Sequence, residues 1–259
     1  MYFWIETRNE VWTLRRALLA ALNFESSWVV LNLAVVPYAL VILAAKQMNI
    51  FVTGGTGYVG RALIPELLAR SHNVRALTRK PSAAKLPSGC EPVFGNALDA
   101  STFVHSIAPC DTFVQLVGVA HPSPGKADAF REIDLVSVRE SVAAASKANV
   151  QHFVYLSVAQ PAPIMKDYQA VRAEGEAMIR ASGMRATFLR PWYILGPGHR
   201  WPYLLLPGYW IAGILPWTRE GARRTGLVTL AQMVRALIKA VENPADKIAI
   251  VEVPDIRKS

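Results

Sequence analysis

Cysteine and charge are both scarce in this chain of 259 residues. The two cysteines, Cys90 and Cys110, lack the spacing of a metal site or of a disulfide framework, which indicates a reduced compartment and does not support structural zinc. Charged residues make up 18% of the chain and hydrophobic residues 52%, which excludes intrinsic disorder. The 16 glycines and 17 prolines follow no period, which excludes a collagen-like chain. Five scattered histidines suggest no metal site: His72, His105, His121, His152 and His199.

Long runs of one charge are also missing. The net charge is +9, yet no run of five basic residues occurs, and basic and acidic residues are interspersed along most of the predicted helices. This distribution is typical of a solvated basic surface, or of a protein that binds an anionic cofactor. We therefore do not expect a nucleic-acid partner.

The first 47 residues have a different composition from the rest. The run from Trp28 to Ala45 holds 18 residues without a charge, and Asn32 and Pro37 interrupt it. Such a run is at the lower limit of a membrane span, so one interpretation is an anchor that touches the membrane through residues 28–45 and leaves the rest on the cytoplasmic side. The alternatives are a misassigned start, because Met48 lies just before a predicted strand, and a helical appendage packed on the domain.

From Met48 onward, predicted strands and helices alternate, which is the pattern of an α/β protein with a doubly wound parallel sheet. We expect one domain over residues 48–259, with a small C-terminal substrate lid near residues 192–228. The strands are expected at Asn49–Val52, Asn73–Leu77, Pro92–Phe94, Thr112–Val117, His152–Leu156, Ala186–Leu189 and Ile248–Val251. The helices are expected at Tyr58–Arg70, Ser101–Ile107, Ala127–Ala148, Lys166–Ser182 and Leu230–Val241.

A glycine-rich loop follows the first predicted strand and leads directly into a helix. Gly54 permits a tight turn, Gly57 lets the backbone approach a pyrophosphate, and Gly60 allows the helix to pack closely on the strand. The helix amino terminus then offers N–H groups and a partial positive charge to the phosphates. This order predicts a Rossmann dinucleotide site formed by Gly54, Thr56, Gly57, Tyr58, Val59 and Gly60.

The end of the second predicted strand indicates which cofactor binds. An acidic residue there favours NAD, whereas a basic residue accommodates the 2′-phosphate of NADP. Arg79 and Lys80 follow this strand, and no carboxylate is present. The two cations favour NADP, although NAD stays possible and both could equally be solvated.

Motifs spread over residues 48–259 resemble those of the extended and atypical short-chain dehydrogenases/reductases. This superfamily includes sugar-nucleotide epimerases, NmrA-type redox sensors and an accessory subunit of respiratory complex I. The similar segments are Thr53–Gly60, Phe94–Asn96, Leu116–Gly118, Tyr155–Ser157, Arg190–Pro191 and Gly196–Gly198. The resemblance implies that Asn96, Ala97, Val117, Gly118 and Pro191 also contact the cofactor, with Asn96 departing from the usual acid.

The resemblance also implies a catalytic serine, a tyrosine acid/base and a lysine four residues after the tyrosine. This chain has Tyr168 followed four positions later by Arg172, on one face of the predicted helix, and Ser157 at the end of the fifth strand. An arginine keeps the charge that lowers the pKa of the tyrosine but cannot relay a proton. We take Tyr168, Arg172 and Ser157 as the candidate catalytic residues, and we expect Asp134 to be structural.

An aromatic segment follows the sixth predicted strand, where the superfamily forms its substrate pocket. Trp192, Tyr193 and the aromatic residues of 201–211 suit an apolar substrate. The sequence thus predicts a cytoplasmic NADP-dependent oxidoreductase that acts on a lipophilic carbonyl compound, and it leaves open whether the protein is an oligomer. The alternative, favoured by the change from lysine to arginine, is a non-catalytic redox sensor or assembly subunit that holds NAD(P).

Overall fold

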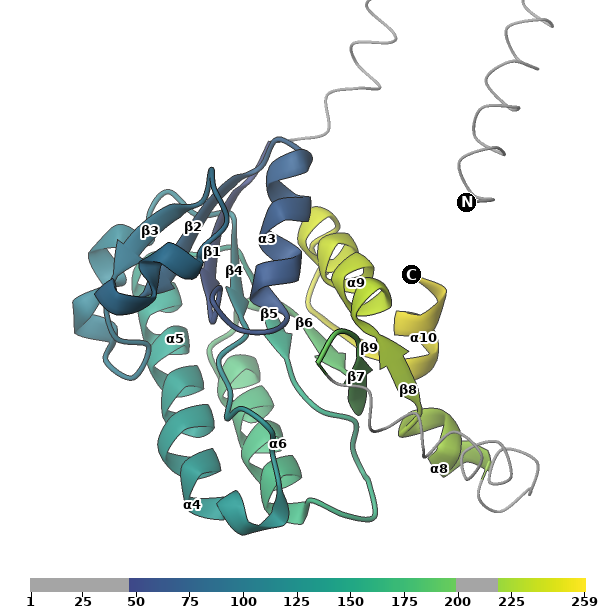
Figure 1. Ribbon diagram of the computed structural model, residues 1–259. Coiled ribbons are helices and arrows are strands. Elements are labelled where there is room, and N and C mark those ends of the chain that lie inside the picture. Colours follow the sequence, from purple (N-terminus) through teal and green to yellow (C-terminus); the bar gives the residue numbers. More distant parts are fainter. Residues whose placement is uncertain (1–46, 199–218) are drawn as a thin grey trace, which may run out of the picture. The chain divides into compact units, whose positions relative to one another are not determined.

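The computed structural model describes residues 47–198 and 219–259, which form a seven-stranded parallel sheet with helices on both faces (Figure 1). The strand order is β3-β2-β1-β4-β5-β6-β9, so the chain starts in the middle of the sheet, moves to one edge and then crosses to the other. This is the doubly wound arrangement predicted from the sequence. The strands are β1 (Asn49–Thr53), β2 (Asn73–Thr78), β3 (Glu91–Phe94), β4 (Thr112–Gln115), β5 (His152–Leu156), β6 (Arg185–Arg190) and β9 (Ile248–Glu252).

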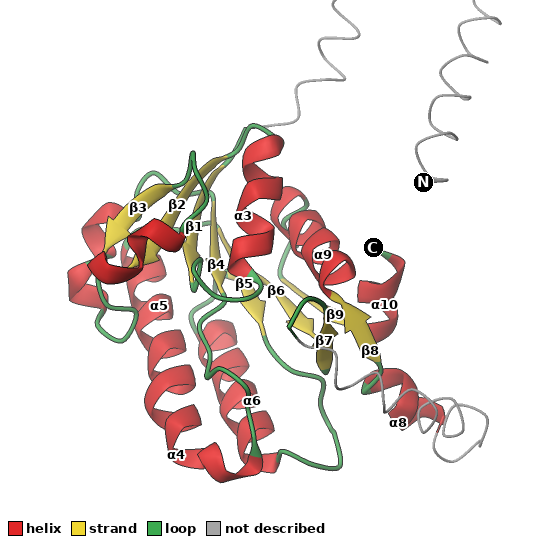
Figure 2. Ribbon diagram, viewed as in Figure 1, coloured by secondary structure: helices red, strands yellow, loops and turns green. Residues whose placement is uncertain are grey.

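Two helix pairs cover the two faces of the sheet (Figure 2). The helices α3 (Gly60–Ala69) and α9 (Leu230–Glu242) contact each other on one face, and α5 (Val136–Lys147) and α6 (Lys166–Ala181) contact each other on the second. Helix α9 begins with a capping box, in which Gln232 N–H donates to Thr229 Oγ1 and the Gln232 side chain accepts from Thr229 N–H. A parallel sheet covered on both faces needs apolar residues at nearly every strand position.

The strand register aligns large side chains in rows. Phe51 of β1 lies opposite Phe113 of β4, which lies opposite Phe153 of β5. The ring centroids of Phe51 and Phe113 are 5.3 Å apart, and those of Phe113 and Phe153 are 5.1 Å apart. This row faces α5 and α6, and because side chains alternate along a strand, a valine row faces α3 and α9. These contacts fix the register of β1, β4 and β5, and the candidate site residues follow the carboxyl ends of these strands.

A smaller parallel pair continues the chain beyond the main sheet. Strand β7 (Tyr193–Leu195) pairs with β8 (Leu227–Thr229). The helices α8 (Arg219–Arg224) and α10 (Val253–Lys258) complete the described elements near the C-terminus. The sequence did not indicate these four short elements.

The predicted helix at Ser101–Ile107 is wrong. The structure has two 3₁₀ turns there, Ala100–Thr102 and Val104–Ser106, separated by Phe103, whose φ of −141° is not helical. Phe103 is 1% exposed and stacks on Phe51 at 6.1 Å, so burial of this ring breaks the helix. The guanidinium of Arg75 donates to the backbone carbonyls of residues 106–109. A helix that continued through this segment would need these carbonyls for its own backbone hydrogen bonds.

The predicted helix over Ala127–Ala148 is interrupted. The chain forms a short α4 (Ala127–Ala129), a π-helical turn over Phe130–Leu135, and then α5. Ser137 Oγ donates to the carbonyl of Asp134 at 2.9 Å, within the altered turn. The π turn is of interest because it holds Asp134, which is fully buried.

Two of the expectations fall largely outside the described residues. The apolar run 28–45 is among residues 1–46, and the central part of the predicted lid is at 199–218. Within residues 47–198 and 219–259, no helix is both long enough and apolar enough to cross a membrane.

We predict that residues 48–259 fold and bind cofactor without residues 1–47. Met48 is 5% exposed within the core, and its backbone N–H donates to His72 Nδ1 at 3.3 Å, so a chain that starts there retains the contacts described for β1. The fragment should melt within about 3 °C of the full chain, since both have the same described core. Thermal denaturation of the two proteins tests this, and an insoluble fragment would show that residues 1–47 belong to the fold.

We further predict that His152 lowers the free energy of unfolding at acidic pH. His152 is fully buried, with Nε2 3.0 Å from Thr187 Oγ1, and burial together with the Arg185 cation lowers its pKa to about 4. Below about pH 6.5 the unfolded chain binds a proton that the folded chain does not take up until about pH 4. The free energy of unfolding should therefore fall across this window, by about 1.4 kcal/mol for each unit of the pKa difference.

Urea unfolding at about pH 7 and about pH 5 measures this effect. His152→Gln, which does not titrate, should reduce the loss of stability, whereas His105→Gln at an exposed position should leave it unchanged. Equal acid sensitivity in wild type and His152→Gln would contradict the assignment.

Candidate functional site

The glycine loop between β1 and α3 has a backbone that only glycine fits at two positions. Gly54 has φ +76°, and a Cβ there would lie 2.7 Å from the carbonyl carbon of Leu116, which follows β4. A Cβ at Gly60 would lie 2.5 Å from the carbonyl oxygen of Gly54, so the first residue of α3 packs directly on the loop. The N–H of Gly57 donates to Gly54 O at 3.0 Å and closes the turn. The loop therefore has the geometry that its glycine spacing predicts.

The other loop residues have different surroundings. Val59 is 8% exposed and packs in the core with α3 and α9, so its side chain anchors the loop. Thr56 and Tyr58 are half-buried and Gly57 is exposed. These three residues lie next to the amino end of α3, where the glycine loop is predicted to bind a pyrophosphate.

The residues expected around the adenosine come from the same edge of the sheet (Figure 1). Arg79 and Lys80 directly follow β2 and are exposed, and Asn96 and Ala97 follow β3. The Asn96 side chain accepts a hydrogen bond from the N–H of Leu98 at 3.1 Å, so the amide also stabilises the turn. Because carboxyl ends of parallel strands meet at one edge, this edge brings together the predicted cofactor residues.

Arg172 lies buried at the centre of the catalytic candidates. The residue is 4% exposed, and Nη2 of its guanidinium forms an ion pair with Asp134 Oδ1 at 2.5 Å. Nη1 donates to the carbonyl of Leu156 at 2.9 Å and to Tyr155 Oη at 3.4 Å. The central guanidinium carbon is 5.0 Å from the centroid of the Tyr168 ring. The expected proximity of Tyr168 and Arg172 is confirmed, and the ion pair with Asp134 adds a partner that the sequence did not reveal.

Burial sets the proton affinity of these groups. Burial raises the pKa of the Tyr168 phenol; the Arg172 cation lowers it in part and the Asp134 carboxylate raises it further. Burial also raises the pKa of the Asp134 carboxyl, against the effect of Arg172. Tyr168 therefore holds its proton at neutral pH, and the Tyr168 ring also packs against Phe130 of the π turn at 4.9 Å.

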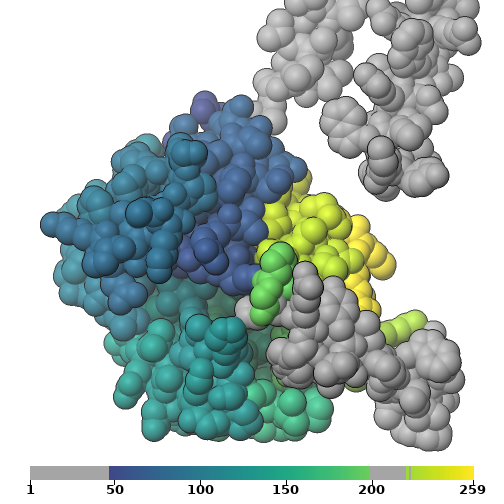
Figure 3. Space-filling model, viewed as in Figure 1, coloured from purple at the N-terminus to yellow at the C-terminus, as the bar shows by residue number. Residues whose placement is uncertain are grey.

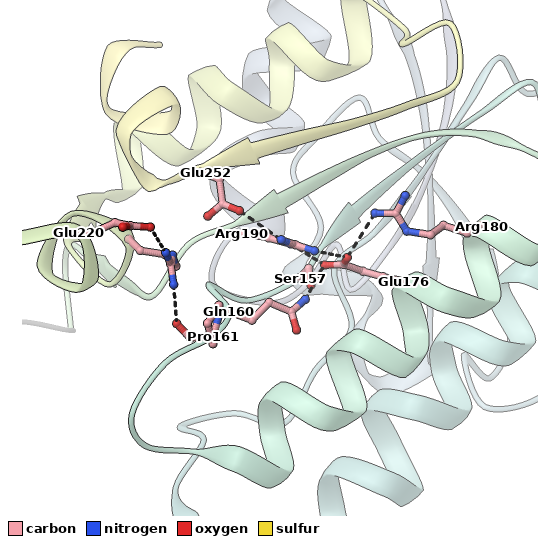
Figure 4. A network of polar contacts seen from close by, with 9 residues as sticks. Ser157, Gln160, Pro161, Glu176, Arg180, Arg190, Glu220 and Glu252 are labelled. Carbon is pink, nitrogen blue, oxygen red and sulfur yellow. Dashed lines mark hydrogen bonds and ion pairs between the residues drawn. The ribbon is translucent and has the colours of Figure 1, made fainter.

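Ser157 belongs to a second buried network, centred on Glu176 (Figure 4). Ser157 Oγ donates to Glu176 Oε1 at 2.6 Å, and Gln160 Nε2 donates to the same oxygen at 3.0 Å. Arg190 binds both carboxylate oxygens of Glu176, at 2.9 and 2.6 Å, and reaches Glu252 at 3.1 Å. A hydroxyl has one hydrogen, so Ser157 offers no donor to a carbonyl while it bonds Glu176.

Sequence reasoning missed Glu176. It lies four residues after Arg172 and eight after Tyr168, so all three share one face of α6, and it is 3% exposed. A carboxylate on the apolar face of a predicted helix was the signal that could have found it, because buried carboxylates are nearly always paired. Asp134 was noticed but its partner was not.

The last predicted cofactor residues border this region. Val117 N–H donates to Gln115 Oε1 at 3.2 Å, and Gly118 follows it. Pro191 is buried after β6, and its carbonyl accepts from Ala159 N–H at 2.9 Å, which ties the ends of β5 and β6 together. Within residues 47–198 and 219–259, no cluster of three histidine, cysteine or acidic side chains could hold a metal ion.

The described part of the lid packs on the glycine loop. A Cβ at Gly196 would clash with Tyr58 Oη, and Leu195 lines a groove of about 610 Å³ together with Ala62 of α3 and Val234 of α9. Figure 3 shows the green segment that ends at residue 198 lying between the blue and yellow parts of the chain. This groove is on the α3 and α9 face, whereas Tyr168 is on α6.

Comparison with known proteins agrees with the fold. Residues 54–200, more than half of the chain, match the family model described as NAD(P)H-binding. The chain is 28% identical over 171 residues to the 4-hydroxy-2-methyl-3-oxo-4-farnesyl-3,4-dihydroquinoline-1-oxide ketoreductase of Stigmatella aurantiaca, covering 58% of this chain and 51% of that protein. It is 25% identical over 173 residues to the 2-alkyl-3-oxoalkanoate reductase of Stenotrophomonas maltophilia, covering 58% and 52%. The chain thus spans about half the length of these curated relatives.

Solved structures show the same architecture. The Bordetella bronchiseptica enzyme WbmH, in complex with NAD+, aligns with a TM-score of 0.60 at 20% identity and covers 80% of this chain and 76% of that one. This likeness concerns the fold, which is that of the short-chain dehydrogenase/reductase and epimerase neighbours. With a family model matched over more than half of its length, the chain belongs to the NAD(P)H-binding family.

Proposed function

We propose that the protein is an NADP-dependent oxidoreductase that reduces a lipophilic carbonyl compound, with Tyr168 as the proton donor. The observation that carries the proposal is the position of Tyr168, on the helix beside the carboxyl edge of the sheet, with the Arg172 cation 5.0 Å from its ring. The phenol carries its proton at neutral pH, which is the form that a donor in a reduction needs, and the neighbouring Arg172 cation lowers its pKa against the effect of burial.

Each group has a separate role in the proposed reaction. NADPH held at the glycine loop after β1 would supply the hydride for the carbonyl carbon. Tyr168 gives its proton to the carbonyl oxygen, and the buried Arg172 stabilises the phenolate that is left. The two reductase relatives, whose names include a ketoreductase and an oxoalkanoate reductase, support a carbonyl substrate.

The substrate and cofactor preferences rest on nearby side chains. Trp192 and Tyr193 follow β6 with ring centroids 5.8 Å apart, and they offer an apolar surface to a small, lipophilic molecule. Exposed Arg79 and Lys80 after β2 favour NADP, although WbmH is described with NAD+.

The second candidate function is a non-catalytic NAD(P)-binding sensor or assembly subunit. Two observations favour it, because Arg172 is paired with Asp134 and the hydroxyl of Ser157 is bonded to Glu176. Both groups are thereby engaged within the protein itself. Tight binding of NADPH without turnover of any carbonyl compound would support this alternative.

Replacement of Tyr168 tests the enzyme hypothesis. Tyr168→Phe removes the proposed acid and should lower kcat for NADPH-dependent carbonyl reduction by about 10²-fold or more, with NADPH affinity little changed. Tyr155→Phe removes the other phenol beside Arg172 and should lower kcat far less, because Tyr155 is fully buried in the sheet. A panel of ketones followed by NADPH absorbance provides the measurement, and equal turnover by wild type and Tyr168→Phe would refute the role of Tyr168.

Cofactor preference is expected to depend on Arg79. A charge-assisted contact to the 2′-phosphate contributes about 1.5–3 kcal/mol, so Arg79→Ala should weaken NADPH binding tenfold or more and leave NADH binding unchanged. Lys85→Ala serves as the control, because Lys85 is an exposed cation at the end of the 3₁₀ helix Lys80–Lys85 that follows Arg79. Fluorescence titration with both cofactors measures the ratio, and equal affinities in the wild type would contradict the preference.

A further inference from the structure

Two buried charges of opposite sign, Arg172 and Asp134, meet beside Tyr168. The Asp134 side chain is fully buried and that of Arg172 nearly so, and their ion pair joins the π turn to α6. A buried cation without its partner is strongly destabilising, because its desolvation is not compensated. Arg172 therefore needs Asp134 in order to lie beside Tyr168.

The longer arginine side chain also needs space, and Gly118 provides it. A Cβ at position 118 would clash with Arg172 Nη2 and would lie 3.2 Å from Asp134 Oδ1. The φ of Gly118 is not in the left-handed region, so the backbone itself does not demand glycine there. The absence of a side chain at Gly118 is explained by the ion pair that passes over it.

On the basis of the proposed function, we propose that Asp134 and Gly118 are positioning residues for Tyr168. Asp134 holds the Arg172 guanidinium beside the Tyr168 ring and offsets its charge, and Gly118 leaves room for the pair.

Two charged groups within the described chain act on the charge of the phenol. Arg172 of the same helix favours the ionised form, whereas Asp134 of the π turn disfavours it. Tyr155 of β5 is a second buried phenol, and its ring centroid is 5.6 Å from the central carbon of the same guanidinium. Removal of the Asp134 charge therefore leaves the Arg172 cation acting alone on Tyr168.

The first test measures the pKa of Tyr168 in the full chain by NMR with ¹³C-labelled tyrosine rings. The Tyr168 resonance is assigned by its loss in Tyr168→Phe. Asp134→Asn should lower the pKa by about one unit, and the alkaline limb of the pH profile of carbonyl reduction should move down with it. Asp128→Asn, at an exposed acid of α4, should change neither. An unchanged Tyr168 pKa in Asp134→Asn would overturn the inference.

The second test is steric and does not depend on the folding of Asp134→Asn. Gly118→Ala should displace Arg172 and lower turnover about tenfold or more. Gly118→Ala/Arg172→Lys should recover most of that loss, because the shorter lysine leaves room for the methyl group. Gly125→Ala is the matched control, since a Cβ there meets nothing within 4 Å. Wild-type turnover in Gly118→Ala, or no recovery in the double variant, would contradict the role of Gly118.

The two proposals fail in different ways. A wild-type protein that binds NADPH and reduces no carbonyl compound refutes the oxidoreductase function, while the NMR titration still decides whether Asp134 controls Tyr168. For that case the melting temperatures of Gly118→Ala and of the double variant replace turnover as the steric readout. Turnover in the wild type with no pKa shift in Asp134→Asn refutes the positioning role alone.

Discussion

Burial of the Arg172 charge is the constraint that explains most of the unusual features around the site. A guanidinium taken out of water must have its charge neutralised and most of its donors satisfied, and among the described residues Arg172 Nε has no hydrogen-bond partner. Asp134 provides the opposite charge at 2.5 Å, Leu156 O accepts at the end of β5, and the Tyr155 and Tyr168 rings lie within 5.6 Å of the central carbon. The π turn presents Asp134, whose second carboxylate oxygen also accepts from Val119 N–H at 2.8 Å, and the lack of a side chain at Gly118 leaves room for the Arg172 guanidinium.

Helix α6 connects this constraint to the rest of the fold. Arg172 and Glu176 are one turn apart on its buried face, and each forms an ion pair with a different element. The first joins α6 to the π turn before α5, and the second joins it to Arg190 at the end of β6. The helix is thus fixed by charge at two successive turns. Tyr168 lies one turn before Arg172 on the same helix, so the two ion pairs also fix its position.

The main sheet could be predicted from the sequence because its signals are local and periodic. Short apolar runs predicted seven strands, and the glycine spacing after Thr53 placed the loop that the backbone confirms. The errors arose where tertiary contacts decide the local structure. Phe103 breaks a helical pattern because its ring is buried against Phe51, and the π turn depends on a partner 38 residues away in Arg172. No window of neighbouring residues contains that information, so Asp134 was recognised as structural while its role was missed.

The site also differs from a lone lysine in the way it distributes charge. A single buried cation beside a tyrosine favours the phenolate, which suits proton removal from an alcohol. Here the cation comes with a carboxylate 2.5 Å away, so the field at Tyr168 is closer to that of a dipole and falls off more steeply with distance. Burial then dominates and raises the pKa of the phenol. At neutral pH the phenol therefore carries its proton, which is the form that the proposed reduction requires, and its raised pKa makes that proton harder to release.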